Sequence, residues 1–163
     1  MKKVSFVIPC YRSANTIGVV VDEIRDTMPT LPEYDYEIIL VNDCSPDNTF
    51  DVISALARSD GRIIAVDLAK NFGQHAALMS GISHSTGDFV VCLDDDGQTP
   101  ANEVGKLLAR LEQDDCDVAM ASYEHKQHSA FRNFGTKLNN RMTEIMLGKP
   151  RDLSMTSYFA IKR

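Results

Sequence analysis

Three consecutive carboxylates, Asp94, Asp95 and Asp96, are the residues of this sequence best suited to chemistry. They follow an apolar run at residues 89–93, whose composition predicts a strand buried on both faces. Adjacent anions repel one another, so such a cluster is costly unless solvent or a cation neutralises it. Proteins bind Mg²⁺ and Mn²⁺ with one or two carboxylates together with waters and substrate phosphates. The cluster therefore indicates a divalent-metal site, with a solvated acidic turn as the alternative.

The position of the cluster favours the functional interpretation. Open α/β sheets bind their ligands outside the carboxyl ends of the strands, and the cluster stands at such an end. Side chains alternate in an extended segment, so we expect Asp94 and Asp96 on one side and Asp95 on the opposite side. Gln98 joins Asp94 and Asp96 if the chain stays extended.

Length and composition describe an ordinary soluble globular protein. The chain has 163 residues, of which 44% are hydrophobic and 25% charged. A single domain of this length buries roughly two thirds of the surface that the unfolded chain exposes. The net charge of −6 argues against a nucleic-acid partner. The four cysteines are scattered without C-x-x-C spacing, so we expect reduced thiols and a cytoplasmic protein. The start lacks a signal-peptide core, and no apolar run reaches the ~20 residues of a membrane span.

Hydrophobic periodicity predicts strands that alternate with helices. This rhythm indicates right-handed βαβ units, hence an α/β fold with a mostly parallel central sheet and helices on both faces. Polar residues at the strand ends then gather at one edge of the sheet, namely Tyr11, Asp43, Lys70 and residues 94–98. The predicted strands are residues 4–8, 36–41, 62–67, 89–93 and 117–122, and the predicted helices are residues 16–28, 49–58, 75–85, 101–113 and an amphipathic segment within 131–146.

Ordered motifs between residues 4 and 122 resemble the family-2 glycosyltransferases. The closest resemblance is to the branch that contains dolichyl- and polyprenyl-phosphate sugar synthases. The motifs are V-I-P-C-Y near the start, V-N-D-C-S-P-D-N-T after the second predicted strand, K-N-F-G-Q-H-A-A-L, and G-D-x-x-V-x-L-D-D-D-G-Q-T-P-x-x-E.

The resemblance implies a GT-A-type nucleotide-binding fold, a nucleotide-diphosphate-sugar donor and Mg²⁺ or Mn²⁺ as cofactor. Pro9 and Tyr11 match positions that flank the nucleotide base, and Asp43 matches a carboxylate that hydrogen-bonds the base. Asp94 matches an acid near the ribose and the metal. The expected metal ligands are Asp94, Asp96 and Gln98, and the expected donor-binding residues are Pro9, Tyr11, Asp43, Asp94, Asp95 and Lys70, the last as a counter-charge.

Two departures from the family pattern change the expected donor pocket. Tyr11-Arg12-Ser13 stands where the family usually has Tyr-Asn-Glu, so a ribose contact from the Glu is missing. Residues 94–98 read Asp-Asp-Asp-Gly-Gln where Asp-Ala-Asp-Leu-Gln is usual, which makes the loop more acidic and more flexible.

Fewer residues of the sequence indicate which acceptor receives the sugar. A sugar hydroxyl needs a general base, whereas a polyprenyl phosphate is already an anion and needs none. Asp152 roughly matches an acidic family position and is the candidate base. Arg132, in a region with a basic bias, is the candidate counter-charge for a phosphate. Both acceptors, a polyprenyl phosphate and a saccharide, remain open at this point.

The sequence as a whole predicts a metal-dependent inverting glycosyltransferase of cell-envelope polysaccharide or lipid-linked sugar synthesis. We expect one catalytic domain over residues 1–163, with a nucleotide-sugar half at 1–122 and the start of an acceptor half at 123–163. Whether the given sequence is a piece of a longer catalytic protein stays open. The expected location is cytoplasmic, at the inner face of the plasma membrane. A homodimer is an open alternative for the oligomeric state. The alternative is a non-catalytic nucleotide-binding or scaffold domain.

Overall fold

The computed structural model describes residues 1–113, 116–121 and 156–163. The chain divides into two compact units, Met1–Met120 with Ser157–Arg163, and Ala121–Thr156. The first unit contains all the helices and strands described below. The predicted amphipathic helix within 131–146, Arg132 and Asp152 lie outside the described residues.

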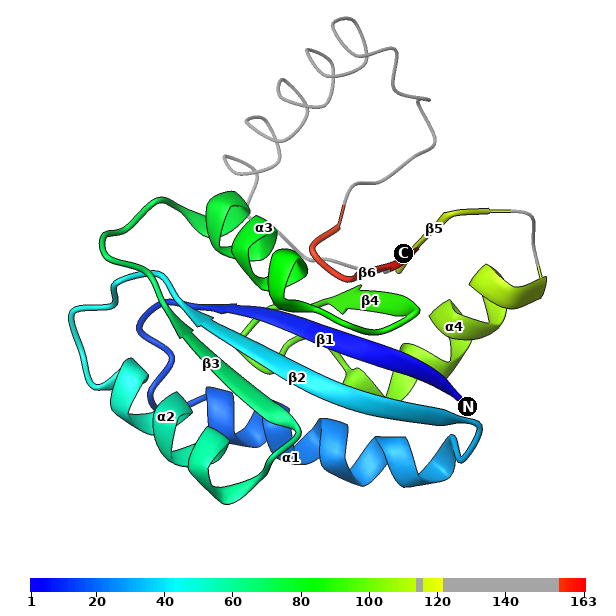
Figure 1. The fold of residues 1–163 in the computed structure, drawn as a ribbon, viewed down its shortest axis with the longest axis horizontal. Coiled ribbons are helices and arrows are strands. Elements are labelled where there is room, and N and C mark those ends of the chain that lie inside the picture. Colours follow the sequence, from blue (N-terminus) through cyan, green and yellow to red (C-terminus); the bar gives the residue numbers. More distant parts are fainter. Residues whose placement is uncertain (114–115, 122–155) are drawn as a thin grey trace, which may run out of the picture. The chain divides into compact units, whose positions relative to one another are not determined.

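A six-stranded sheet forms the centre of the first unit, in the order β3-β2-β1-β4-β6-β5 (Figure 1). β1 pairs in parallel with both β2 and β4, and β2 pairs in parallel with β3. The predicted mostly parallel sheet is therefore confirmed. The strands are β1 (Lys2–Cys10), β2 (Tyr34–Asn42), β3 (Ile63–Asp67), β4 (Phe89–Cys92), β5 (Val118–Met120) and β6 (Phe159–Lys162).

The sequence analysis did not predict β6, and this strand makes the β4–β6–β5 part of the sheet antiparallel. β6 lies between β4 and β5 and runs antiparallel to both. The predicted fifth strand therefore pairs with an antiparallel neighbour. The sequence analysis assigned no element to residues 159–162, and β6 pairs with the two strands that flank it.

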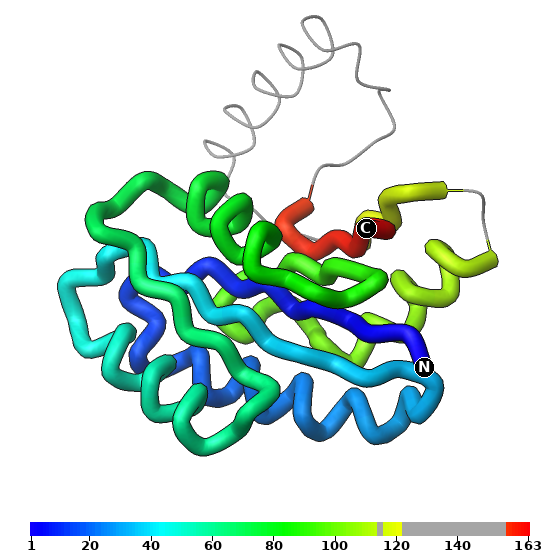
Figure 2. The backbone as a smooth tube through the Cα atoms, viewed as in Figure 1, coloured from blue at the N-terminus to red at the C-terminus, as the bar shows by residue number. Residues whose placement is uncertain are grey.

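Helices cover both faces of the sheet, as predicted. α3 lies over one face, and α1 and α2 lie over the other (Figure 1). Figure 2 follows the chain from β1 through α1 into β2, which runs beside β1 in the same direction. The helices are α1 (Ile17–Thr27), α2 (Thr49–Ser59), α3 (Gln74–His84) and α4 (Val104–Gln113), with short 3₁₀ turns at Met28–Thr30 and Ala101–Glu103.

α3 packs closely on β1 and β2, and this contact places its first turn. Ala77 is fully buried against a cluster that includes Val7 and Val41. At Gly81 an added Cβ would lie 2.4 Å from Val7 Cγ1, a distance that side chains do not tolerate. The glycine therefore allows a close approach of helix to sheet. Through this close approach α3 packs directly on β1 and β2.

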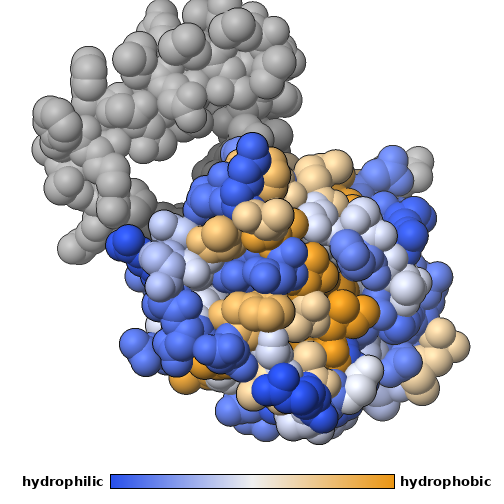
Figure 3. All heavy atoms as spheres, turned by 60° about the vertical axis from the view of Figure 1, so that its left-hand side comes forward, coloured by the Kyte–Doolittle hydropathy of each residue, from blue (hydrophilic) through white to orange (hydrophobic). Residues whose placement is uncertain are grey.

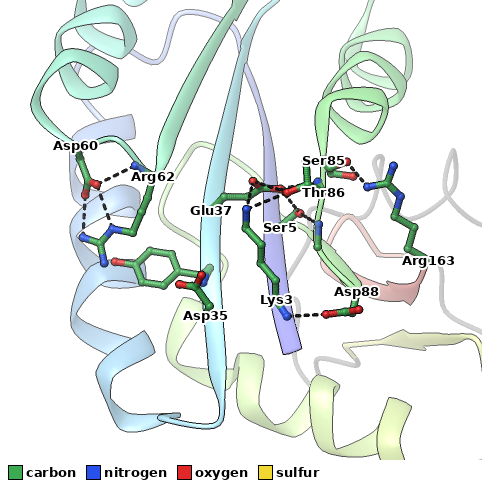
Figure 4. A network of polar contacts seen from close by, with 12 residues as sticks. Lys3, Ser5, Asp35, Glu37, Asp60, Arg62, Ser85, Thr86, Asp88 and Arg163 are labelled. Carbon is green, nitrogen blue, oxygen red and sulfur yellow. Dashed lines mark hydrogen bonds and ion pairs between the residues drawn. The ribbon is translucent and has the colours of Figure 1, made fainter. Parts of the chain in front are cut away.

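Glu37 is a buried carboxylate near the N-terminal ends of β1 and β2 (Figure 4). It accepts hydrogen bonds from Lys3 Nζ and Ser5 Oγ, each at 2.6 Å, and from the backbone N–H of Thr86 at 2.6 Å. Burial by itself raises the pKa of Glu37, but the bonds from Lys3, Ser5 and Thr86 outweigh it and lower the pKa to about 2. Glu37 thus ties β1, β2 and the turn before β4 together at the end of the sheet opposite the strand-end polar residues.

The edge strand β3 leaves apolar side chains partly exposed. Ile64 and Val66 are partly buried against the core. Figure 3 brings the side of the molecule with β3 forward, and apolar side chains reach the surface there. Over the described residues, no helix is both long and apolar enough to cross a membrane.

All four cysteines are free thiols, as the sequence predicts. Cys10 and Cys92 are buried at the ends of β1 and β4. Burial raises the pKa of Cys92 to about 12. Burial, together with the nearby charge of Asp95, raises the pKa of Cys10 as well. Both groups are neutral thiols that pack in the core.

Candidate functional site

A cavity of about 400 Å³ opens at the carboxyl ends of β1, β2 and β4. Its position matches the edge at which open α/β sheets bind ligands. Four aspartates contribute to its wall, and its described lining includes no Lys or Arg. The lining residues are Pro9, Cys10, Tyr11, Asp43, Asn71, Gly73, Gln74, Asp94, Asp95 and Asp96.

Asp43, directly after β2, is almost fully buried and organises the entry to α3. Its Oδ1 accepts a hydrogen bond from the Phe72 N–H at 2.8 Å, and its Oδ2 accepts one from the Gly73 N–H at 2.9 Å. Gly73 has φ +87°, a conformation that side chains disfavour. The carboxylate and the glycine together set the turn from which α3 begins.

The loops after β1 and β2 are held in an uncommon backbone conformation. Arg12 and Cys44 have φ values of 58° and 49°, in the left-handed region that non-glycine residues seldom adopt. The Arg12 N–H donates to Ser45 Oγ at 2.7 Å, and Ser45 Oγ donates to Asp47 Oδ1 at 2.6 Å. The two loops are thus joined, and Tyr11 is held at the cavity with 45% of its surface exposed.

Asp95 connects the loop after β4 to the loop after β1. Its Oδ2 accepts hydrogen bonds from the Tyr11 N–H at 3.1 Å and from Ser13 Oγ. Ser13 and Asp95 are positions at which this sequence departs from the family pattern. The structure brings these two departures into direct contact.

Asp94 is held by two donors that the sequence did not reveal. Gln74 Nε2, in the first turn of α3, donates to Asp94 Oδ1 at 2.9 Å, and Ser157 Oγ donates to Asp94 Oδ2. Gln74 belongs to the K-N-F-G-Q-H motif, so a signal for it was present. The sequence contained no signal for Ser157, because this residue precedes β6, a strand that was not predicted.

The acidic loop bends, so the extended chain that the expected alternation assumed is not present over residues 95–97. The chain turns at residues 95–97, with Gly97 at φ +71°, and Asp94, Asp95 and Asp96 all line the cavity. Asp96 is exposed, and its Oδ1 accepts the Gln98 N–H at 2.9 Å. Gln98 is exposed and does not belong to the cavity lining, so its role as a metal ligand stays a prediction.

Lys70 lies in the loop before α3 and is also outside the cavity lining. Its ammonium lies 4.9 Å from the centroid of the Phe72 ring, and both side chains are exposed. Because Phe72 is bonded through its backbone to Asp43, Lys70 is near the cavity. Its role as a counter-charge for the donor stays a prediction.

The residues at the cavity fit a divalent cation that also contacts a ligand. Within the described ranges, no group of three Asp, Glu, His or Cys side chains converges as a preformed metal site. Asp94 and Asp96 are both at the cavity wall, and two carboxylates are what Mg²⁺ or Mn²⁺ takes from a protein when substrate phosphates complete the shell.

Solved structures with the same arrangement identify the fold as GT-A. The mannosyltransferase PcManGT from Pyrobaculum calidifontis, in complex with GDP-Man and Mn²⁺, matches with a TM-score of 0.71 and 20% identity, over 99% of this chain and 45% of that one. Mannosyl-3-phosphoglycerate synthase from Rubrobacter xylanophilus matches with a TM-score of 0.77 and 19% identity, over 99% of this chain and 53% of that one. At this identity the likeness shows the fold, which confirms the prediction.

The chain belongs to glycosyl transferase family 2, whose profile matches residues 5–161. Among curated relatives, the undecaprenyl-phosphate 4-deoxy-4-formamido-L-arabinose transferase of Klebsiella pneumoniae subsp. pneumoniae is 35% identical over 150 residues. The protein of the same name from Yersinia enterocolitica is 36% identical over 150 residues. Each alignment covers 91% of this chain and 45% of the relative, so the chain spans about half the length of the curated relatives it matches.

Proposed function

We propose that the protein is a metal-dependent inverting glycosyltransferase that moves a sugar from a nucleotide-diphosphate sugar to a polyprenyl phosphate in cell-envelope synthesis. The observation that carries the proposal is the single cavity that unites Tyr11, Asp43 and residues 94–96 at the carboxyl edge of the sheet. The relatives named for undecaprenyl phosphate support the choice of acceptor.

The donor lies along the cavity with its base toward Asp43 and its diphosphate toward the acidic loop. Pro9 and the exposed ring of Tyr11 flank the base, and the Asp43 carboxylate accepts a hydrogen bond from it. Each Asp43 oxygen has a second lone pair beyond the one used by Phe72 or Gly73. Asp43 therefore binds the base without releasing the entry to α3.

The charge balance of the cavity requires a cation. A diphosphate is an anion, and four aspartates with no described Lys or Arg line the cavity. Asp94 and Asp96, with Gln98, would hold Mg²⁺ or Mn²⁺, which supplies positive charge against the diphosphate as the leaving group departs. Gln74 and Ser157 keep the Asp94 carboxylate oriented, and Lys70 adds counter-charge from the loop before α3.

The transfer is a single displacement. A phosphate oxygen of the lipid attacks the anomeric carbon, and the bond from that carbon to the diphosphate oxygen breaks, which inverts the configuration. The attacking oxygen is ionised near neutral pH, so the step needs positioning and counter-charge but no proton acceptor. We assign the counter-charge on the acceptor side to Arg132. Association with the inner face of the plasma membrane follows from a lipid acceptor.

The donor half of the proposal is tested by thermal shift with a panel of nucleotide sugars in the presence of Mn²⁺ or EDTA. We expect stabilisation by one nucleotide class that depends on the metal. Stabilisation that is the same in EDTA would contradict the metal dependence. Binding of a donor without turnover on any acceptor would favour a non-catalytic nucleotide-binding domain.

The acceptor half is tested by transfer assays with a short-chain prenyl phosphate and a panel of saccharides. We expect turnover on the prenyl phosphate, a sharp loss in Arg132→Ala and little change in Asp152→Asn. Loss of a general base typically costs ~10²- to 10⁴-fold in rate. Turnover only on saccharides, with such a loss in Asp152→Asn, would show instead that the acceptor is a sugar hydroxyl.

A further inference from the structure

Three consecutive backbone N–H groups in the loop after β1 donate to side chains from other parts of the chain. The donors are Tyr11, Arg12 and Ser13, and their acceptors are Asp95 Oδ2 at 3.1 Å, Ser45 Oγ at 2.7 Å and Thr49 Oγ1 at 2.9 Å, respectively. Arg12 has φ 58°, a conformation that a side chain disfavours and that persists only where the surroundings impose it. Side chains outside this loop therefore determine its conformation.

Asp47 orients two of these three acceptors. Its Oδ1 accepts hydrogen bonds from Ser45 Oγ and Thr49 Oγ1, each at 2.6 Å. A hydroxyl has one proton to donate and two lone pairs that accept. Because both protons go to Asp47, the two hydroxyl oxygens present lone pairs to the N–H groups of Arg12 and Ser13. Hydrogen bonds in such a chain polarise and strengthen one another.

Asp47 is an acceptor that lies outside the cavity. The hydrogen bonds from Ser45 and Thr49 lower the pKa of Asp47, so its carboxylate is ionised at neutral pH and only accepts. The side chain is exposed and does not belong to the described lining of the cavity, whereas Tyr11 does. Any effect of Asp47 on a ligand in the cavity must therefore pass through the loop that carries Tyr11.

We propose that Asp47 is a positioning residue for nucleotide binding, which fixes the Ser45 and Thr49 hydroxyls and so holds the loop after β1 in the conformation that presents Tyr11 to the ligand. The inference rests on the proposed nucleotide-sugar donor. Without these bonds the loop would leave its disfavoured conformation, and ligand binding would then have to order it again at a cost in entropy. Asp47 removes this cost before the ligand arrives.

Calorimetry on the whole protein, with UDP and GDP in the presence of Mn²⁺, tests the effect on affinity. We expect Asp47→Ala to weaken binding roughly 3- to 100-fold, the range of coupling within one hydrogen-bond network. Asp47→Asn keeps an acceptor oxygen and should stay closer to the unsubstituted protein. Asp51→Asn, which removes an exposed carboxylate from the first turn of α2, is the matched control and should not change the affinity.

A double variant separates the two hydroxyls from the role of Asp47 at the start of α2. Asp47 Oδ1 also accepts the Thr49 N–H at 3.2 Å, at the first residue of this helix. Ser45→Ala combined with Thr49→Val removes both hydroxyls and keeps that backbone bond. We expect this variant to lose about as much affinity as Asp47→Ala. If it binds the nucleotide as tightly as the unsubstituted protein, the proposal is overturned.

A fluorescent side chain at position 11 reports on the loop without any ligand. The sequence contains no Trp, so Tyr11→Trp introduces a unique fluorophore. We expect Asp47→Ala in this background to lower the anisotropy of the indole and to increase its quenching by acrylamide, and Asp51→Asn to change neither. A capping role confined to α2 would leave both signals as they were, and that outcome would overturn the proposal.

The failure of this inference and the failure of the proposed function give different results. If the unsubstituted protein binds UDP or GDP and Asp47→Ala binds it equally well, only the role of Asp47 is overturned. If the unsubstituted protein binds neither nucleotide, the proposed donor is overturned and the inference with it. Weaker binding in Asp47→Ala together with a more mobile indole supports both.

Discussion

The Asp43 carboxylate accepts the Gly73 N–H at 2.9 Å, although the two residues are 30 positions apart in the chain. Asp43 directly follows the second strand of the sheet, and Gly73 precedes α3, whose first residue also lines the cavity. One buried side chain therefore both lines the proposed donor site and anchors the helix beside it. This double role makes its substitution informative.

Asp43→Ala should weaken nucleotide binding by ~1.5–3 kcal/mol, because a hydrogen bond to a charged group is lost. It should also lower the free energy of unfolding, since the Phe72 and Gly73 N–H groups lose their acceptor. Calorimetry and urea unfolding measure the two effects. Asp43→Asn keeps an acceptor oxygen and should retain more stability than Asp43→Ala. If Asp43→Ala binds the nucleotide as tightly as the unsubstituted protein does, the role of Asp43 is purely structural.

Asp96→Asn should remove most of the Mn²⁺-dependent stabilisation by UDP or GDP. A ligand at 100 times its Kd stabilises a protein by about 2.7 kcal/mol, so the loss is measurable in a melting experiment. The side chain is exposed and accepts one local bond from Gln98, so the melting temperature without ligand should stay the same or rise as one repelling charge disappears. An unchanged metal effect would show that Asp96 is not a ligand.

Gln74→Ala and Ser157→Ala should each weaken Mn²⁺ binding in the presence of nucleotide. Each variant removes one of the two donors that orient the Asp94 carboxylate. Groups of this kind typically change metal affinity by ~10- to 100-fold. Electron paramagnetic resonance of bound Mn²⁺ gives the affinity without an activity assay. Gln113→Ala, at the exposed end of α4, is the matched control and should not change it. Parent-like affinity in both variants would contradict the positioning role.

Glu37 should make stability depend on acid pH. Its pKa is lowered from an ordinary 4.5 to about 2, so its contribution is complete above about pH 4.5 and is lost as the pH falls toward 2. Glu37→Gln should cost about 1–3 kcal/mol at neutral pH and flatten this part of the stability curve. Urea unfolding between pH 2 and 7 measures both. The exposed Glu33→Gln is the control. A variant with the parent's pH dependence would exclude Glu37 as its cause.

Local sequence determined the central strands and the edge that carries the site. Runs such as residues 89–93 are rich in residues that fit a sheet buried on both faces, and helical periodicity separates them. Parallel strands bring their carboxyl ends to one edge. Asp43 and the acidic cluster therefore had to converge, and Pro9 and Tyr11 with them.

Only the tertiary structure decided how the carboxylates are used. Asp95 meets Ser13 across 82 positions and Asp94 meets Ser157 across 63, and neither spacing has a periodic signal. These contacts depend on strand register, on the bend at Gly97 and on β6, which pairs with β4 and β5. Side-chain alternation placed Asp95 away from its neighbours because it assumed an extended chain. In the folded structure the loop bends at residues 95–97, and Asp94, Asp95 and Asp96 all line the cavity.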